Sequence, residues 1–155
     1  MLPPYDEAFE LLPKKMDSYW ARVNLTAIGL QESRLIHQKQ IGGPARGLWQ
    51  FEQGNRVSRG GVYGIYLHPQ SRPHLESACK LLCIPCDPVA IYESLEGTDD
   101  RIDIVCARLL LWTNPRPLPT KQDVAWQYYL DTWRPGKPHP ETWADFWKQA
   151  EVWHG

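Results

Sequence analysis

The chain has 155 residues, of which 43% are hydrophobic and 23% are charged, proportions that are ordinary for a globular protein. This length predicts one domain, residues 1–155, with a core large enough to fold without disulfides or metals. The net charge of −1, from 17 basic and 18 acidic residues, excludes a general attraction to nucleic acid, and no apolar stretch is long enough for membrane insertion.

The first residues, Met1 to Ala8, have neither a basic segment nor an apolar run. They therefore predict no secretory signal, and we expect the protein to be made and kept in a cytoplasm. The composition is unusually rich in aromatic residues, with eight Trp and seven Tyr. Such large flat side chains serve both cores and sugar-binding clefts, and core packing is the commoner use.

The first predicted helix covers residues 17–35, because apolar or small residues recur at helical spacing along it. These residues are Ala21, Leu25, Ile28 and Leu35. Glu32 falls on the same face. Between this helix and the next lies a Gly-rich segment, residues 38–70, in which only short runs such as Gly47–Phe51 could be extended. We expect a structured loop there, and long loops inside compact domains are usually functional.

Five more helices follow in the sequence. One begins at Ser71 as N-cap, with Pro73 in its first turn, and ends before Pro85. The next begins at Asp87 with Pro88 in its first position, and Gly97 ends it. A third follows residues 98–100 and presents one apolar face, made of Ile102, Val105, Cys106, Leu109 and Leu110.

After the stiff connector 114–119, Thr120 is expected to cap a helix that runs to about Trp133. The last helix covers about residues 141–152, with Trp143, Trp147 and Ala150 on one buried stripe. The fold class is therefore all-α, with at most a minor β element.

Three of the four cysteines have the spacing Cys79-x3-Cys83-x2-Cys86, which could hold an iron–sulfur cluster. Enzymes with such clusters need a large α/β barrel, and this sequence does not alternate strands and helices. Zinc lacks a fourth ligand at a suitable spacing. We therefore expect reduced thiols in the core, with no metal and no cofactor.

Glu32 is the candidate catalytic residue, because it lies on an apolar helix face near the negative end of the helix dipole. Both partial burial and the dipole disfavour the carboxylate, so its pKa should rise toward neutrality. A Glu that is protonated near pH 7 can donate its proton to a glycosidic oxygen. The alternative is a structural Glu that bonds a neighbouring helix or loop.

Two segments, Thr26–Arg34 and Gly43–Phe51, resemble the Glu-Ser and Gly-Leu-(Met/Trp)-Gln motifs of soluble lytic transglycosylases and goose-type lysozymes. This resemblance implies a lysozyme-like fold and cleavage of the β-1,4 bond between N-acetylmuramic acid and N-acetylglucosamine in peptidoglycan. It also implies catalysis by Glu32 and a supporting, substrate-binding role for Ser33. Further substrate contacts are implied for Gly47, Leu48, Trp49 and Gln50.

Residues 42–47 and 128–140 are also similar to small phage lysis proteins of the same superfamily. That similarity implies an endolysin that waits in the host cytoplasm, without a signal, until a membrane lesion releases it to the periplasm and cell wall. The alternative is a virion-associated protein. We expect a monomer whose partner is the glycan strand.

Lytic transglycosylases carry Ala-Tyr-Asn in a late helix, with the Tyr near the acid or the substrate, whereas this chain has Ala125–Tyr129. Either Tyr128 or Tyr129 could take that role. The two side chains point about 100° apart on a helix, so we expect at most one to face a cleft. Their alternative role is packing in the core or on the surface.

The outcome of bond cleavage depends on a second carboxylate. Glu52, the acid in the Gly-rich loop, is the candidate; it could equally be a solvated acid or a partner of Arg46 or Arg56. Without a convincing second acid the sequence favours a lytic transglycosylase over a hydrolytic muramidase. A catalytically silent glycan-binding or virion structural protein is a third alternative.

Overall fold

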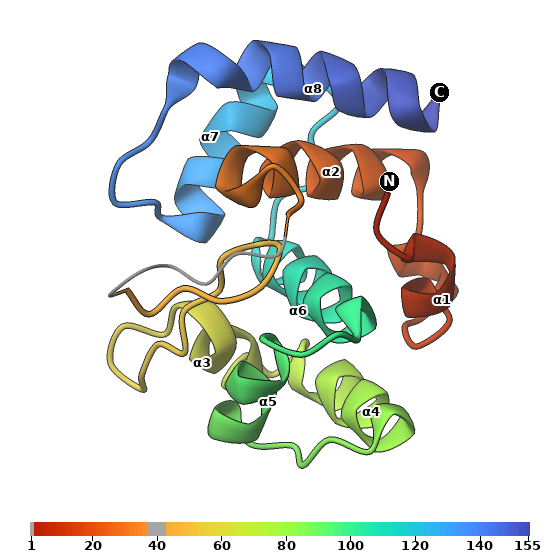
Figure 1. The fold of residues 1–155 in the computed structure, drawn as a ribbon, viewed down its shortest axis with the longest axis vertical. Coiled ribbons are helices and arrows are strands. Elements are labelled where there is room, and N and C mark those ends of the chain that lie inside the picture. Colours follow the sequence, from red (N-terminus) through yellow and green to blue (C-terminus); the bar gives the residue numbers. More distant parts are fainter. Residues whose placement is uncertain (1, 37–42) are drawn as a thin grey trace.

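Helices dominate the computed structural model, which describes residues 2–36 and 43–155. Gly42 and residues 38–41 of the expected loop lie outside the described residues. The helices, drawn in Figure 1, are α1 (Tyr5–Phe9), the 3-10 turn η1 (Lys14–Met16), α2 (Tyr19–Ser33), α3 (Gly61–Tyr66), α4 (Arg72–Leu82), α5 (Pro88–Ser94), α6 (Asp100–Thr113), α7 (Gln122–Trp133) and α8 (Pro140–His154). Within the described ranges, the one extended pairing is an isolated bridge between Arg46 and Phe51. The all-α expectation is confirmed.

Helix α6 lies at the centre of the molecule, with α2, α7 and α8 on one side and α3, α4 and α5 on the other (Figure 1). Every residue from Ile102 to Leu111 is buried, including Asp103 and Arg108. A helix that is apolar nearly all round is stable only when neighbours cover every face, so α6 becomes the core around which the others pack.

Helix α2 packs along α8, and its C-terminal end lies beside α7 (Figure 1). The Ser18 hydroxyl caps it by accepting a hydrogen bond of 3.0 Å from the Ala21 amide. Near its other end, a Cβ atom at Gly29 would lie 2.3 Å from Leu35 Cδ2. A side chain there would displace that of Leu35, so glycine lets Leu35 pack closely against the helix.

Of the three residues predicted to cap helix N-termini, one does so and two do not. Asp87 does cap α5, accepting a hydrogen bond of 2.9 Å from the Ala90 amide. Ser71 does not cap α4, because its buried hydroxyl donates to the Leu109 carbonyl at 3.2 Å instead. Thr120 does not cap α7, which begins after Lys121 without a side-chain cap. The apolar faces of α6 and α8 are buried as predicted.

The Gly-rich segment is less of a loop than predicted, since α3 occupies residues 61–66. Gly61 makes this possible: it has φ = 59°, and a Cβ atom there would lie 2.0 Å from the Glu52 carbonyl oxygen. Residues 47–50 form a turn between the paired Arg46 and Phe51, so of the run Gly47–Phe51 that could be extended, Phe51 alone joins a bridge.

The cysteines are all free thiols, but they do not share one environment. Cys79 and Cys106 are buried in the core, as expected. Cys83 is exposed, because the chain turns into the left-handed region there, with φ = 58°, and ends α4. In residues 2–36 and 43–155 no group of three or more His, Cys, Asp or Glu side chains is arranged to hold a metal. None of the described helices combines the length and hydropathy that a membrane span requires.

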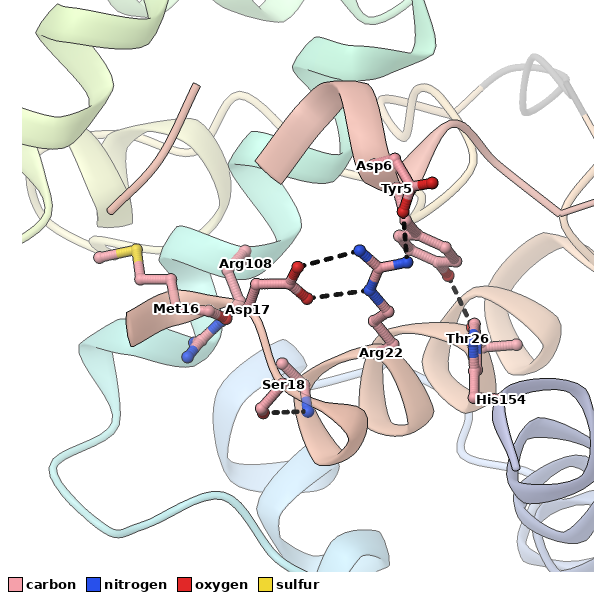
Figure 2. Close-up of polar contacts among 10 residues, drawn as sticks. Tyr5, Asp6, Met16, Asp17, Ser18, Arg22, Thr26, Arg108 and His154 are labelled. Atoms are coloured by element: carbon pink, nitrogen blue, oxygen red, sulfur yellow. Dashed lines mark hydrogen bonds and ion pairs between the residues drawn. The ribbon is translucent and has the colours of Figure 1, made fainter. Parts of the chain in front are cut away.

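A polar network fastens both ends of the chain to α2 (Figure 2). The Arg22 guanidinium donates two hydrogen bonds of 2.9 Å to Asp17 and one of 2.8 Å to Asp6. Beside it, the Thr26 hydroxyl lies 2.6 Å from the Tyr5 hydroxyl and 2.8 Å from Nε2 of His154. These contacts hold the first half of α2, whereas Glu32 lies in its last turn.

Candidate active site

A cavity of about 800 Å³ lies at the C-terminal end of α2. Its wall combines that helix end with the segment 45–61, the last turns of α7 and the loop that leads to α8. The lining residues are Gln31, Glu32, Ala45, Gln50, Phe51, Glu52, Gly54, Ser58, Gly60, Gly61, Leu110, Tyr129, Trp133, Arg134, Pro135, Gly136, Lys137 and His139. A volume of this size suits a ligand of a few sugar rings or of drug-like size.

Glu32 contributes a carboxyl group to this wall from the last turn of α2. Its side chain is partly buried, and this burial raises the pKa of Glu32 to about 7. The Tyr129 hydroxyl donates a hydrogen bond of 2.8 Å to Oε1, which opposes the rise but does not cancel it. Near neutral pH the group is therefore divided between acid and carboxylate, as the helix position predicted.

Tyr129 is held in place by aromatic neighbours. Its ring stacks on Trp143, with centroids 5.4 Å apart and planes 7° apart, and Trp126 lies at 5.5 Å. Burial and the neighbouring Glu32 raise the pKa of Tyr129, so the hydroxyl stays protonated and can donate. Tyr128 instead points into the core, where its hydroxyl donates to the Leu111 carbonyl at 3.0 Å. Only Tyr129 of the pair faces the cavity.

Ser33 does not line the cavity, contrary to the expected substrate contact. Its side chain is buried, donates to the Leu48 carbonyl at 2.6 Å and accepts from the Leu35 amide at 3.1 Å. The Ser33 hydroxyl thus links the end of α2 to the turn at residues 47–50 by a hydrogen bond.

The Gly47–Gln50 turn places one of its four residues, Gln50, on the cavity wall. Leu48 and Trp49 are 2% and 1% exposed, and the Trp49 indole donates to the Leu25 carbonyl at 2.8 Å. The substrate contacts expected of Gly47, Leu48 and Trp49 are therefore corrected. Burying these apolar side chains stabilises the fold more than displaying them, so they anchor the wall from behind.

Gly47 is needed for this turn. It has φ = 75°, and a Cβ atom there would lie 2.3 Å from Oδ2 of Asp103. That oxygen accepts a hydrogen bond of 3.0 Å from the Leu48 amide. Burial raises the pKa of Asp103 to about 8. Asp103 was not identified from the sequence, although it is a single acid in the apolar run of α6.

Glu52 lines the same cavity as Glu32 and is exposed. Its expected partners are engaged elsewhere: Arg46 pairs with Glu96, and the Arg56 guanidinium lies 5.8 Å from the centre of the Tyr63 ring. Glu52 is therefore placed as a solvated acid at the site.

Sequence reasoning also missed the aromatic and basic residues of the wall. The Trp133 indole donates to the Trp49 carbonyl at 3.1 Å, and its ring meets Phe51 edge-on at 5.8 Å. Arg134, Lys137 and His139 follow Trp133 on the loop to α8. The signal that could have found them was the Pro-rich composition of residues 133–140, a stiff loop with charged residues beside the helix of Tyr129.

Comparison of the chain with protein-family models, with curated proteins and with solved structures finds no match. The functional argument therefore depends on the geometry of the site. One carboxyl group with a pKa near neutrality, bonded by a phenol in a cavity that Trp133 also lines, is suited to proton transfer on a ring-shaped polar substrate.

Proposed function

We propose that this protein cleaves the β-1,4 bond between N-acetylmuramic acid and N-acetylglucosamine in peptidoglycan glycan strands, with Glu32 as the acid/base. The observation that carries the proposal is the Glu32 carboxyl, with a pKa of about 7, on the wall of a cavity of about 800 Å³. The resemblance of residues 26–34 and 43–51 to lytic transglycosylases and goose-type lysozymes supports it. A lysozyme-like fold is part of the proposal.

The reaction we favour is lytic transglycosylation. Protonated Glu32 donates its proton to the glycosidic oxygen while the bond from C1 of N-acetylmuramic acid to that oxygen breaks and N-acetylglucosamine leaves. The Glu32 carboxylate then accepts the proton of the C6 hydroxyl of the same muramic residue, whose oxygen bonds to C1. The product is a 1,6-anhydro sugar, and Glu32 ends protonated again. One carboxyl group is enough for both steps.

Tyr129 is suited to hold Glu32 during these steps. It donates to one oxygen of Glu32, so the other oxygen is left to exchange the proton with substrate. The half-buried Trp133 supplies an apolar face against which a sugar ring can pack, and the buried Phe51 ring supports it edge-on.

Hydrolysis is the second candidate, because Glu52 lines the same cavity and could activate a water molecule. The role in the cell that we infer from the resemblance to phage lysis proteins is host lysis as an endolysin; virion association is the alternative. A silent glycan-binding or structural protein would need no proton donor.

Digestion of purified peptidoglycan by wild type, Glu32→Gln and Glu52→Gln tests the proposal, with the released muropeptides resolved by mass spectrometry. We expect wild type and Glu52→Gln to release anhydro products, lighter than hydrolytic ones by one water. Glu32→Gln should fold but lose activity by at least about a hundredfold, because general acid catalysis contributes that much or more. Wild-type activity should fall as pH rises through about 7, where Glu32 loses its proton.

Reducing ends that disappear in Glu52→Gln would make the enzyme a muramidase with Glu52 as its second carboxylate. Full activity of Glu32→Gln would refute the assignment of the acid. The absence of products from wild type would favour the silent alternative.

A further inference from the structure

A second cavity, of about 540 Å³, adjoins the candidate active site. The two share Ser58, Leu110 and Arg134 in their walls. Between them the Arg134 guanidinium donates to the Ser58 carbonyl at 3.2 Å, which joins the loop before α3 to the end of α7. The two cavities are therefore neighbours that share one wall.

The second cavity is rich in guanidinium groups. Arg59, Arg116 and Arg134 line it, and Asp131, which pairs with Arg116, is the acid in its wall. Two positive charges therefore remain unbalanced. Arg59 is exposed and donates to one carbonyl, that of Leu67, at 3.3 Å, so most of its donors face solvent.

Helices α6 and α7 both end at this cavity, and their C-terminal ends carry partial negative charge. That charge is about half a unit for each helix. It offsets about one of the two unbalanced charges, so the cavity keeps an excess of positive charge. His68 adds a neutral donor or acceptor: its pKa is lowered by burial, and its Nδ1 atom has no hydrogen-bond partner among the described residues.

We propose that this second cavity binds the carboxylates of the peptide branch carried by the lactyl group of N-acetylmuramic acid. The inference rests on the proposed function, because it places the glycan in the first cavity and the branch in the second. A guanidinium presents two parallel N–H donors that match the two oxygens of a carboxylate, so arginines are suited to this ligand. Because the two cavities adjoin at Arg134, the branch of a glycan bound in the first cavity lies near the second.

Cleavage kinetics test the site on two substrates: glycan strands with their peptides, and the same strands after an amidase has removed them. We expect Arg59→Gln to raise KM about tenfold on the peptide-bearing strands, as expected for a charge-assisted hydrogen bond, with kcat unchanged. On bare strands it should behave as wild type. Arg116→Gln, from the connector after α6, should have the same effect.

Arg56→Gln is the matched control, because Arg56 is an exposed arginine in the same loop that lines neither cavity. It should behave as wild type on both substrates. Circular dichroism would confirm that each variant is folded. An unchanged KM in both Arg59→Gln and Arg116→Gln, with cleavage intact, would overturn the carboxylate site and leave the proposed function standing.

Binding of a soluble ligand separates the two proposals. In calorimetric titration, N-acetylmuramyl-L-alanyl-D-glutamate should bind wild type and Arg56→Gln about tenfold more tightly than its diamide does, and Arg59→Gln should lose this difference. If no strand is cleaved but the difference is present, the carboxylate site stands and the proposed reaction fails. Equal affinity for acid and diamide would overturn the site whatever the cleavage result.

Discussion

The Glu32 carboxyl is partly buried in the wall of the cavity, and this burial affects both its pKa and the stability of the fold. The pKa of the group is about 7 in the folded protein because burial disfavours the carboxylate, against an ordinary value of 4.5. Below both values the carboxyl is protonated whether the chain is folded or not. Between them the folded state holds the proton more tightly, so the free energy of unfolding decreases as pH rises. Above about pH 7 the full cost of burying the charge is present.

Replacement of Glu32 by Gln should therefore stabilise the protein in a pH-dependent way. The amide keeps an oxygen that can accept the Tyr129 hydrogen bond and does not ionise. We expect the variant and wild type to be similarly stable near pH 4, and the variant to be more stable by roughly 1–3 kcal/mol at pH 8. Urea unfolding across this pH range measures the difference.

The exposed residue Glu10 provides the control. Its replacement by Gln should give no comparable growth of the difference with pH. If Glu32→Gln followed the wild-type curve at every pH, Glu32 would not be buried enough to act as a neutral acid, and the catalytic proposal would lose its physical basis.

At the level of elements, the turn at residues 47–50 is built from behind by three helices. Ser33 of α2 donates to the Leu48 carbonyl, Asp103 of α6 accepts from the Leu48 amide, and Trp133 of α7 donates to the Trp49 carbonyl. A short turn without a sheet has few internal hydrogen bonds, so these side chains determine where the wall of the cavity stands.

Ser33→Ala should therefore lower the free energy of unfolding by about 1–3 kcal/mol, the usual cost of leaving a buried polar partner without its hydrogen bond. The control is Ser77→Ala, since Ser77 is exposed and donates only to its own helix, at the Pro73 carbonyl. Denaturant unfolding compares the two. An equal, small effect would show that the Ser33 tie contributes little to the position of the turn.

The sequence predicted the long helices because apolar spacing directly reports which side is buried, as in α6 and α8. It did not predict α3. This helix begins at Gly61, where only a residue without a side chain leaves room for the Glu52 carbonyl. It also misplaced Ser71 and Thr120 as caps, because a hydroxyl before a helix has several competing partners. Such contacts involve residues distant in the chain, which local patterns do not contain.

The same distinction applies to the site. Glu32 could be identified from one helix, since its neighbours on the apolar face predict its burial. Trp49 was misassigned to the cleft because the sequence does not tell which side of the turn faces the core. The contact between Glu32 and Tyr129 joins residues 97 positions apart, and the sequence left Tyr128 and Tyr129 as equal candidates.

For the molecule as a whole, Thr26 joins the two ends of the chain. Its hydroxyl contacts Tyr5, 21 positions before it, and His154, 128 positions after it (Figure 2). Since α2 also carries Glu32, the helix that positions this carboxyl is held at its middle by both terminal segments. Loss of this junction should loosen α1 and α8 together.

Thr26→Val tests this, because valine has nearly the shape of threonine but its side chain forms no hydrogen bond. The free energy of unfolding should fall by about 1–3 kcal/mol, and amide hydrogen exchange should accelerate in both α1 and the last turn of α8. Thr120→Val, at an exposed position that caps no helix, should change neither quantity. Faster exchange in only one of the two segments would mean that Thr26 stabilises each end separately, whereas faster exchange in both means that the termini are held as one unit.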